Sequence, residues 1–248
     1  NSPPTEVFVG DTVPFGVEIK NLGAYSTTPQ LWLHGHDQNI IKLGWNGVTP
    51  GEIDARDDTN PVGGFEIYES NNVEIALPAG VDSYGTNMKL TVCYPYKTFA
   101  SAAVCIDPDP TNSGDDACAA RDVSLSGGQG GPVGITNIAE DSSKDKVRFT
   151  ITISNLGGGT VYKKSDGSPC TNLRANEIDI VSVKPQAISG HQLSCKPEPV
   201  RLVNGHGIVY CEAPMEGFPT SAFTTVLRID LDYYYKSSIS KSINVRRI

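Results

Sequence analysis

The chain has 248 residues, 38% of them hydrophobic, which is enough for one large or two medium domains with ordinary cores. Its formal net charge of −8 argues against nucleic-acid binding as the general role of the chain. Because no run of about 18 apolar residues occurs, we expect no membrane-spanning helix within it.

The charge is unevenly distributed along the chain. Residues 1–119 contain 5 Lys and Arg against 16 Asp and Glu, whereas residues 120–248 contain 15 against 12. We prefer to interpret this as a drift of surface composition. The alternative is a head-to-tail contact between copies, because opposite charges orient binding partners.

The opening residues, NSPPTEVFVGD, lack the charged and then apolar segments of a secretion signal, so they resemble a mature or trimmed end. We expect the N-terminal segment PPTEVFV to be exposed. It could then pair with an edge strand of a neighbouring copy, which would build a strand-swapped array.

Two segments of the first half of the chain return in the second half. FGVEIKNLG at 15–23 returns as FTITISNLG at 149–157, and LTVCYPYKTFASAAVCI at 90–106 is similar to IDLDYYYKSSISKSINV at 229–245. Two matches in the same order predict a duplicated domain, since the period is too long for a solenoid repeat. Apolar and polar residues alternate in these segments, which predicts β-strands, and Asn-Leu-Gly predicts the corner that ends the earlier strand.

The segment LHGHD places His34 and His36 on one face of a predicted strand, beside Asp37. Two histidines at this spacing can share a metal ion, but no third ligand is evident, so we favour a solvated strand end. The acidic loop EIDARDDTN at 52–60 offers oxygen ligands to Ca²⁺, and here too solvation is the preferred interpretation.

The motif Tyr-x-Tyr-Lys occurs once in each half and predicts a hairpin between the last two strands of each domain. In the first half, the turn would lie near Phe99, and Tyr94 and Tyr96 would share one face of a strand. We expect these rings to pack with hydrogen-bonded hydroxyl groups, with an aromatic binding platform as the alternative. Trp32 and Trp45 are further candidate contacts, for which core packing is again preferred.

The segment DPDPTNSGDDACAARD predicts an acidic linker at 107–122, between a first domain at 1–106 and a second at 123–248. Its carboxylates are candidate Ca²⁺ ligands, although their spacing differs from that of an EF-hand loop and a solvated linker is preferred. The four candidates are Asp107, Asp109, Asp115 and Asp116. We expect no other cofactor.

The chain contains six cysteines, which allow fifteen pairings. Two pairs would close hairpins, one around Phe99 and one around Asn204-Gly205, and the remaining two cysteines would then pair with each other. The predicted pairs are Cys93–Cys105, Cys195–Cys211 and Cys118–Cys170. Disulfides are typical of oxidising compartments, so we expect an extracellular or cell-surface protein.

The sequence contains no G-x-S-x-G, H-E-x-x-H, Walker or dinucleotide motif, and GGQGG is not followed by a helical pattern. We therefore assign no catalytic residues and do not expect an enzyme.

Four segments together resemble a group of predicted surface proteins of small-genome archaea, known mostly from environmental sequence. These segments are NLG, CYPYKTFASAAVCIDPDP, DVSLSGGQGGPVGIT and LRIDLDYYYKSSISKSI. The most specific part is the run from Cys93 to Pro132. The resemblance implies a secreted or membrane-anchored protein with tandem immunoglobulin-like domains, and it implies no activity.

These observations predict an all-β protein of two tandem, disulfide-bonded, immunoglobulin-like β-sandwiches. The expected function is that of a non-catalytic structural or adhesive protein of a cell surface or filament, which associates with itself or with other surface proteins or glycans. The alternative is a carbohydrate- or protein-binding module of a larger surface protein.

Overall fold

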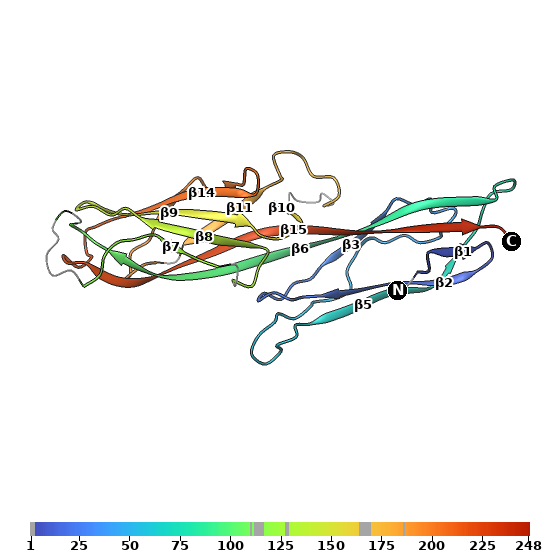
Figure 1. Cartoon of the computed structure of the whole chain (residues 1–248), viewed down its shortest axis with the longest axis horizontal. Helices are drawn as coiled ribbons and strands as arrows, with labels where there is room; N and C mark the ends of the chain where they lie inside the picture. The colour runs from blue at the N-terminus through green and yellow to red at the C-terminus, as the bar shows by residue number, and fades with distance from the viewer. Residues whose placement is uncertain (1–2, 110, 112–116, 127–128, 164–169, 186) are drawn as a thin grey trace.

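The computed structural model describes residues 3–109, 111, 117–126, 129–163, 170–185 and 187–248. The described residues form strands and no helix, which confirms the predicted all-β class. The strands are arranged in two lobes along one long axis (Figure 1). That these lobes are two tandem immunoglobulin-like domains stays a prediction.

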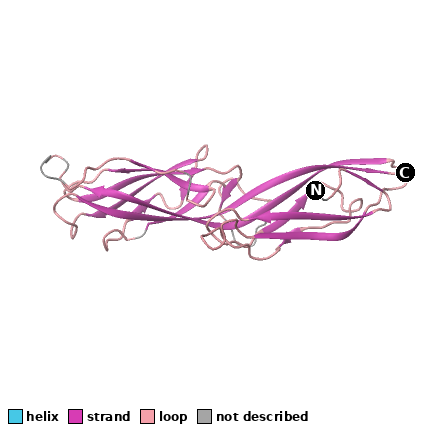
Figure 2. Ribbon diagram, turned by 60° about the horizontal axis from the view of Figure 1, so that its bottom comes forward, coloured by secondary structure: helices cyan, strands magenta, loops and turns pink. Residues whose placement is uncertain are grey.

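Two long strands run through both lobes (Figures 1 and 2). β6 (Ser83–Ile106) and β15 (Phe223–Arg246) pair antiparallel along all 24 residues of each. At about 3.4 Å per residue, this pair, which we call the ribbon, is roughly 80 Å long. The predicted hairpins are therefore wrong, because each Tyr-x-Tyr-Lys motif lies in the middle of a continuous strand.

The length of β6 follows from an apolar alternation that does not stop at Phe99. Every second side chain from Met88 to Leu90, and again from Tyr96 to Ile106, is buried. Pro95 has no N–H group to offer to a neighbouring strand. The ladder between β6 and β3 (Gln30–His34) ends at Cys93, so Pro95 interrupts no hydrogen bond with β3.

The ribbon is the centre of one sheet that spans both lobes. In the first lobe this sheet adds β3, β4 (Asn46–Val48) and the parallel strand β1 (Glu6–Phe8). In the second lobe it adds β10 (Thr160–Tyr162), β11 (Ile180–Pro185) and β13 (Val200–Arg201).

Each lobe also has a smaller sheet of its own. In the first lobe this sheet consists of β2 (Thr12–Lys20) and β5 (Phe65–Glu74). In the second lobe its order is β12 (Ser194–Lys196), β14 (His206–Pro214), β9 (Lys146–Asn155), β8 (Val133–Glu140) and β7 (Val123–Ser124). Antiparallel sheets that share a core in this way are consistent with a β-sandwich.

Both cores take residues from both halves of the chain. β6 gives Met88 and Leu90 to the first core and Val104 and Ile106 to the second. β15 does the reverse, since its early residues lie in the second core and its last apolar residue, Val245, lies in the first. Each lobe is thus completed by a strand segment that continues from the other lobe.

Disulfides join all six cysteines. The predicted pair Cys195–Cys211 is confirmed, and it links β12 to β14. The predicted pair Cys93–Cys105 is wrong. These residues lie twelve apart on one extended strand, about 40 Å from each other, whereas a disulfide needs Cα atoms within about 7 Å.

The predicted pair Cys118–Cys170 is also wrong, because each of these residues bonds to a cysteine of β6. Cys93 bonds to Cys170 with a Cα–Cα distance of 6.4 Å, and Cys105 bonds to Cys118 with 5.9 Å. The first of these disulfides fastens a loop of the second lobe to the middle of the ribbon. The second fastens the predicted linker to the end of β6.

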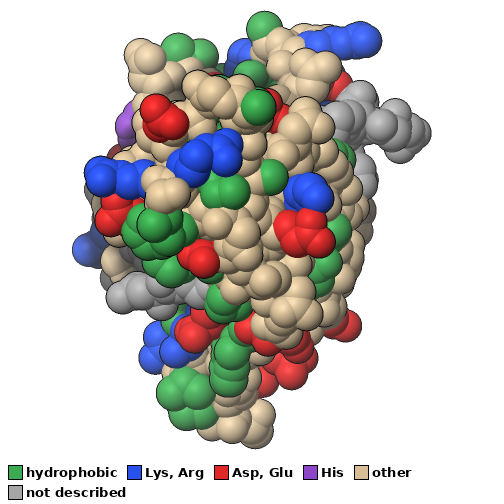
Figure 3. Space-filling view, turned by 90° about the vertical axis from the view of Figure 1, so that its right-hand side faces the viewer, with side chains coloured by type: hydrophobic (Ala, Val, Ile, Leu, Met, Phe, Trp, Pro, Cys, Tyr) green, Lys and Arg blue, Asp and Glu red, His purple; other side chains and the backbone are tan. Residues whose placement is uncertain are grey.

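The N-terminal strand and the basic C-terminal end both pack onto the first lobe. Val7 is buried, so the expectation of an exposed N-terminal strand is wrong for β1. Arg246 forms an ion pair with Glu6 at 2.7 Å, and Arg247 donates to the carbonyls of Leu77 and Pro78. Basic and acidic side chains are intermixed on this end of the molecule (Figure 3). Part of the charge asymmetry is therefore neutralised within the chain.

Candidate functional site

The two Asn-Leu-Gly corners have the same hydrogen bonds. Asn21 accepts from the N–H of Gly23 at 3.1 Å and donates to the carbonyl of Tyr25 at 2.8 Å. Its counterpart Asn155 accepts from the N–H of Gly157 at 3.2 Å and donates to a carbonyl four residues ahead at 3.0 Å. The prediction that the repeated phrase encodes a structural corner is confirmed.

The repeated tyrosines explain why the two repeated segments occur together. Tyr96 donates its hydroxyl to Asn21 at 3.3 Å, and Tyr235 donates to Asn155 at 3.1 Å. Tyr94 pairs with Tyr235 across the ribbon, and Tyr96 pairs with Tyr233. Four tyrosine rings therefore lie together at the centre of the ribbon, on the face that carries both corners.

Glycine is required at the third position of each corner, because a Cβ atom there would meet the tyrosine hydroxyl. At Gly157 it would lie 2.3 Å from Oη of Tyr235, whereas a Cβ on the adjacent Gly158 meets nothing within 4 Å. We expect Gly157→Ala to lower the free energy of unfolding by about 1–3 kcal/mol through overpacking. Gly158→Ala is the matched control and should change it by less than about 0.5 kcal/mol. Equal urea midpoints for the two variants would contradict the assigned corner geometry.

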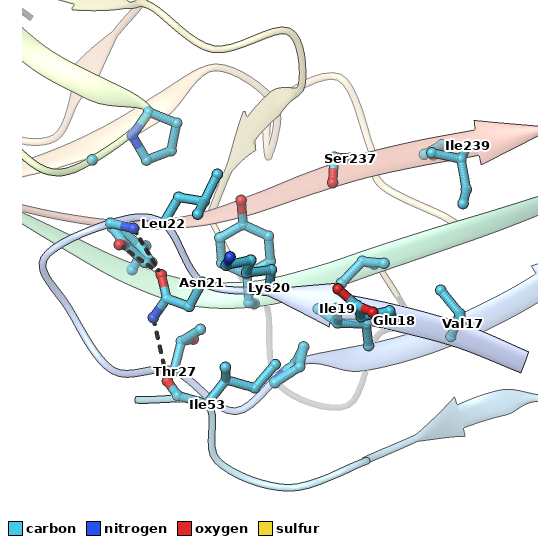
Figure 4. Close-up of a pocket in the computed structure, with 18 of the residues that line it drawn as sticks. Val17, Glu18, Ile19, Lys20, Asn21, Leu22, Thr27, Ile53, Ser237 and Ile239 are labelled. Carbon is cyan, nitrogen blue, oxygen red and sulfur yellow. Dashed lines mark hydrogen bonds between the residues drawn. The ribbon is translucent and has the colours of Figure 1, made fainter. Parts of the chain in front are cut away.

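A groove of about 550 Å³ lies next to the first corner, and it is the main candidate site. One wall is β2, from Val17 to Lys20, and the floor includes Ser237 and Ile239 of β15 (Figure 4). A smaller hollow of about 90 Å³ continues along β2 and shares Val17 and Ile239 with the groove. The groove is therefore elongated and follows the edge of a strand.

Tyr94 lies in the floor of this groove and is half-buried, whereas Tyr96 is buried. Burial raises the pKa of the Tyr94 hydroxyl well above its usual value, and the neighbouring Tyr235 and Tyr96 add to the shift. The preferred interpretation of packing is confirmed for Tyr96. Tyr94 packs with it at a centroid distance of 5.7 Å and also reaches the groove, so a binding role for Tyr94 stays a prediction.

The two tryptophans occupy different places. Trp45 is buried in the first core, donates to Ser70 Oγ at 3.0 Å and contacts the ring of Tyr68, so the expectation of core packing is confirmed for it. Trp32 of β3 is half-buried and packs against a small separate cluster that contains the disulfide Cys93–Cys170. Neither ring lines the main groove, although Trp45 contributes to the smaller hollow.

His34 ends β3, and His36 follows Gly35, whose φ of +85° turns the chain. His36 Nε2 lies 2.8 Å from the carbonyl oxygen of Leu43, and the N–H of Asp37 donates to the Tyr84 hydroxyl at 3.0 Å. No group of three metal-binding side chains occurs among the residues that the structure describes. Coordination by the two histidines stays untested.

The candidate calcium ligands are only partly described, since Asp115 and Asp116 lie outside the described residues. Asp107 accepts from the N–H of Asp109 at 2.9 Å. The Asp109 carboxylate accepts from Thr111 Oγ1 at 2.8 Å and forms an ion pair with Lys144 at 3.3 Å. The Thr111 hydrogen bond, with help from Lys144, lowers the pKa of Asp109. A cation at this place would compete with Lys144, and calcium binding stays a prediction.

The second acidic loop is closed by its own hydrogen bonds. Asp57 Oδ1 accepts from the hydroxyl of Thr59 at 2.7 Å and from the N–H of Asn60 at 2.7 Å. The Thr59 hydroxyl is the main cause of the lowered pKa of Asp57. This carboxylate therefore stabilises a turn, and the preference for a solvated loop over a calcium site stays a prediction.

Sequence reasoning did not identify the groove. Its walls come from β2, β6 and β15, which are brought together only by a ribbon that passes through both lobes. The one available signal was the repeat itself. The repeat identifies β2 and β9 as counterparts, so the strands that pair with each of them can be compared.

Comparisons with protein-family models, with curated proteins and with solved structures found no match to this chain.

The described part of the chain holds no helix with the length and apolar character needed to cross a membrane.

Proposed function

We propose that the protein is a non-catalytic structural or adhesive unit of a cell surface or extracellular filament, able to associate with itself or with other surface proteins or glycans. The observation that carries this proposal is the ribbon, whose two strands belong to both cores. A shared ribbon joins the lobes without a flexible connection, so the molecule is suited to serve as a stiff spacer.

The disulfides give further support. Three intramolecular disulfides are typical of proteins that work in oxidising surroundings, and the extracellular location proposed here fits them. The resemblance of the sequence to predicted surface proteins of small-genome archaea is part of the same proposal.

The test is the solution mass of the chain by light scattering across concentration, with Ca²⁺ and with a chelator. Self-assembly requires the mass to grow above the 26.5 kDa of one chain as concentration rises. If Ca²⁺ promotes growth, Asp109→Asn should remove the response and Asp58→Asn, in the other acidic loop, should not. A mass that stays at one chain under every condition would refute the self-assembling form of the proposal.

A second candidate function is favoured by the groove beside β2. A binding module for a protein or carbohydrate needs a concave surface with apolar and polar groups, and the groove offers Ile239, Tyr94 and Lys20 together. This module would work as a single chain, so a constant mass in light scattering would favour it over self-assembly.

A further inference from the structure

The smaller sheets of the two lobes differ at the strand that would follow β2. β9 lies between β14 and β8 in the second lobe. Its repeat counterpart in the first lobe, β2, pairs only with β5 among the described residues. β8 has no counterpart there, so one edge of β2 is open in this part of the structure.

The open edge presents backbone groups that a strand can bind. The N–H of Asn21 donates to the carbonyl of Gly64 at 2.9 Å, on the side of β5. Successive residues of a strand direct their backbone groups to opposite sides, so those of Glu18 and Lys20 point to the open edge. In the second lobe the matching edge is occupied, since the N–H of Leu156 donates to the carbonyl of Pro132, directly before β8, at 2.8 Å.

The side chains beside this edge are less covered than their counterparts. Val17 and Ile19 are half-buried, whereas the matching residues Ile151 and Ile153 are fully buried. On the ribbon, Ile239 is 65% exposed, whereas its counterpart Ala100 is 6% exposed. In the second lobe, β8 pairs with β9, and its apolar side chains belong to the same core as Ile151, Ile153 and Ala100.

The groove lies where a strand equivalent to β8 would run. It follows β2 through the residues that correspond to the partners of β8 on β9, and it continues into the hollow beside Val17 and Ile239 (Figure 4). The sequence of β8 in the second lobe therefore indicates which kind of strand would fit the open edge of β2 in the first lobe.

We propose that this groove binds an extended polypeptide strand of a partner protein, antiparallel to β2 and apolar at alternate positions. This inference rests on the proposed non-catalytic surface role and names the class of partner. Main-chain hydrogen bonds to Glu18 and Lys20 supply the general attraction, and the apolar side chains supply the selectivity. The pattern follows β8, in which Val133, Ile135 and Ile138 are fully buried and the register shifts once between Ile135 and Asn137.

The probe is a synthetic peptide with the sequence of residues 132–140, PVGITNIAE, labelled with a fluorophore. We expect saturable binding to the full chain by fluorescence anisotropy. A peptide carrying Ile135→Asp and Ile138→Asp should bind at least tenfold more weakly, because it cannot place apolar side chains beside Ile19 and Val17. Equal binding of the two peptides, or no saturable binding of the first, would overturn the proposal.

Two matched pairs of variants locate the binding. Glu18→Pro removes an N–H at the open edge without removing a hydrogen bond to β5, and it should weaken binding at least tenfold relative to Glu18→Ala. Ile239→Asp should do the same, whereas Val226→Asp, on an exposed site of the same strand in the second lobe, should not. Because all these sites are exposed, circular dichroism should show folded variants.

The outcomes separate this inference from the general function. If neither Glu18→Pro nor Ile239→Asp weakens peptide binding, the peptide replaces β8 in the second lobe. That result would overturn the proposal. Saturable binding of an oligosaccharide in place of the peptide would also overturn it. A chain that self-assembles in light scattering but does not bind the peptide would keep the proposed surface role and lose the strand-binding groove.

Discussion

Phe149→Ala in the second lobe is expected to unfold the first lobe as well. Phe149 is fully buried in the second core, so its truncation should cost about 3–5 kcal/mol. Both strands of the ribbon contribute side chains to both cores. If the second core loses its packing, the same two strands are therefore destabilised in the first lobe. We therefore expect both lobes to unfold in a single cooperative transition at lower urea concentration.

Trp45 makes this measurable, because it lies in the first core. In a Trp32→Phe background it is the sole tryptophan, so its fluorescence reports the first lobe alone. The urea midpoint of Trp45 should fall together with that of circular dichroism in the Phe149→Ala variant. Ile208→Ala, on an exposed position of the neighbouring strand β14, is the control and should change little. A Trp45 transition that does not move, beside an earlier transition in circular dichroism, would show that the lobes unfold independently.

The duplicated strands and corners could be predicted from the sequence because their signals are local. The alternation of Phe149, Ile151 and Ile153 has a period of two, and the Asn-Leu-Gly corner is closed by hydrogen bonds within five residues. The extent of the ribbon could not be predicted in the same way. A strand of 24 residues is far longer than the usual five or six, so this stretch of sequence favours a hairpin near Phe99, although the strand in fact continues.

The errors in disulfide pairing follow from that one misplaced turn. Cys195 and Cys211 flank a true hairpin turn at Asn204-Gly205, where both residues have positive φ, and their pairing was predicted correctly. Cys93 and Cys105 flank no turn. Because β6 is continuous, both cysteines form disulfides with residues outside this strand. The groove was missed for a related reason, because an open strand edge is a property of neighbours that are distant in sequence.

Three tyrosines predict a steep loss of stability in alkali: Tyr94 and Tyr233 at the centre of the ribbon, and Tyr162 on the neighbouring strand β10. Burial raises the pKa of Tyr94, Tyr162 and Tyr233 far above the ordinary value of 10.0, so these hydroxyls stay protonated in the folded protein. The unfolded chain ionises them near pH 10. A pKa that is raised in the folded state contributes stability that is fully present below the unfolded pKa, and this stability is lost as pH rises above it.

Each such tyrosine should lower the free energy of unfolding by about 1.4 kcal/mol per pH unit above pH 10. Three together amount to roughly 4 kcal/mol per unit, against a total stability on the order of 5–15 kcal/mol, so cooperative unfolding is expected within a few units. Urea unfolding at several pH values, with tyrosinate absorbance as a second signal, measures the slope.

Tyr233→Phe distinguishes this titration from general alkaline damage. The variant loses the hydrogen bond between the Tyr233 hydroxyl and Thr98 Oγ1, which is 2.8 Å long, so it should be about 1 kcal/mol less stable at neutral pH. Above pH 10 its stability should fall more slowly than that of the parent chain, by about 1.4 kcal/mol per unit, because one ionising group is gone. Tyr210→Phe, at an exposed position, should keep the parent slope. Identical slopes for the parent and Tyr233→Phe would mean that the buried hydroxyl ionises without unfolding, and the ribbon centre would then be open to water.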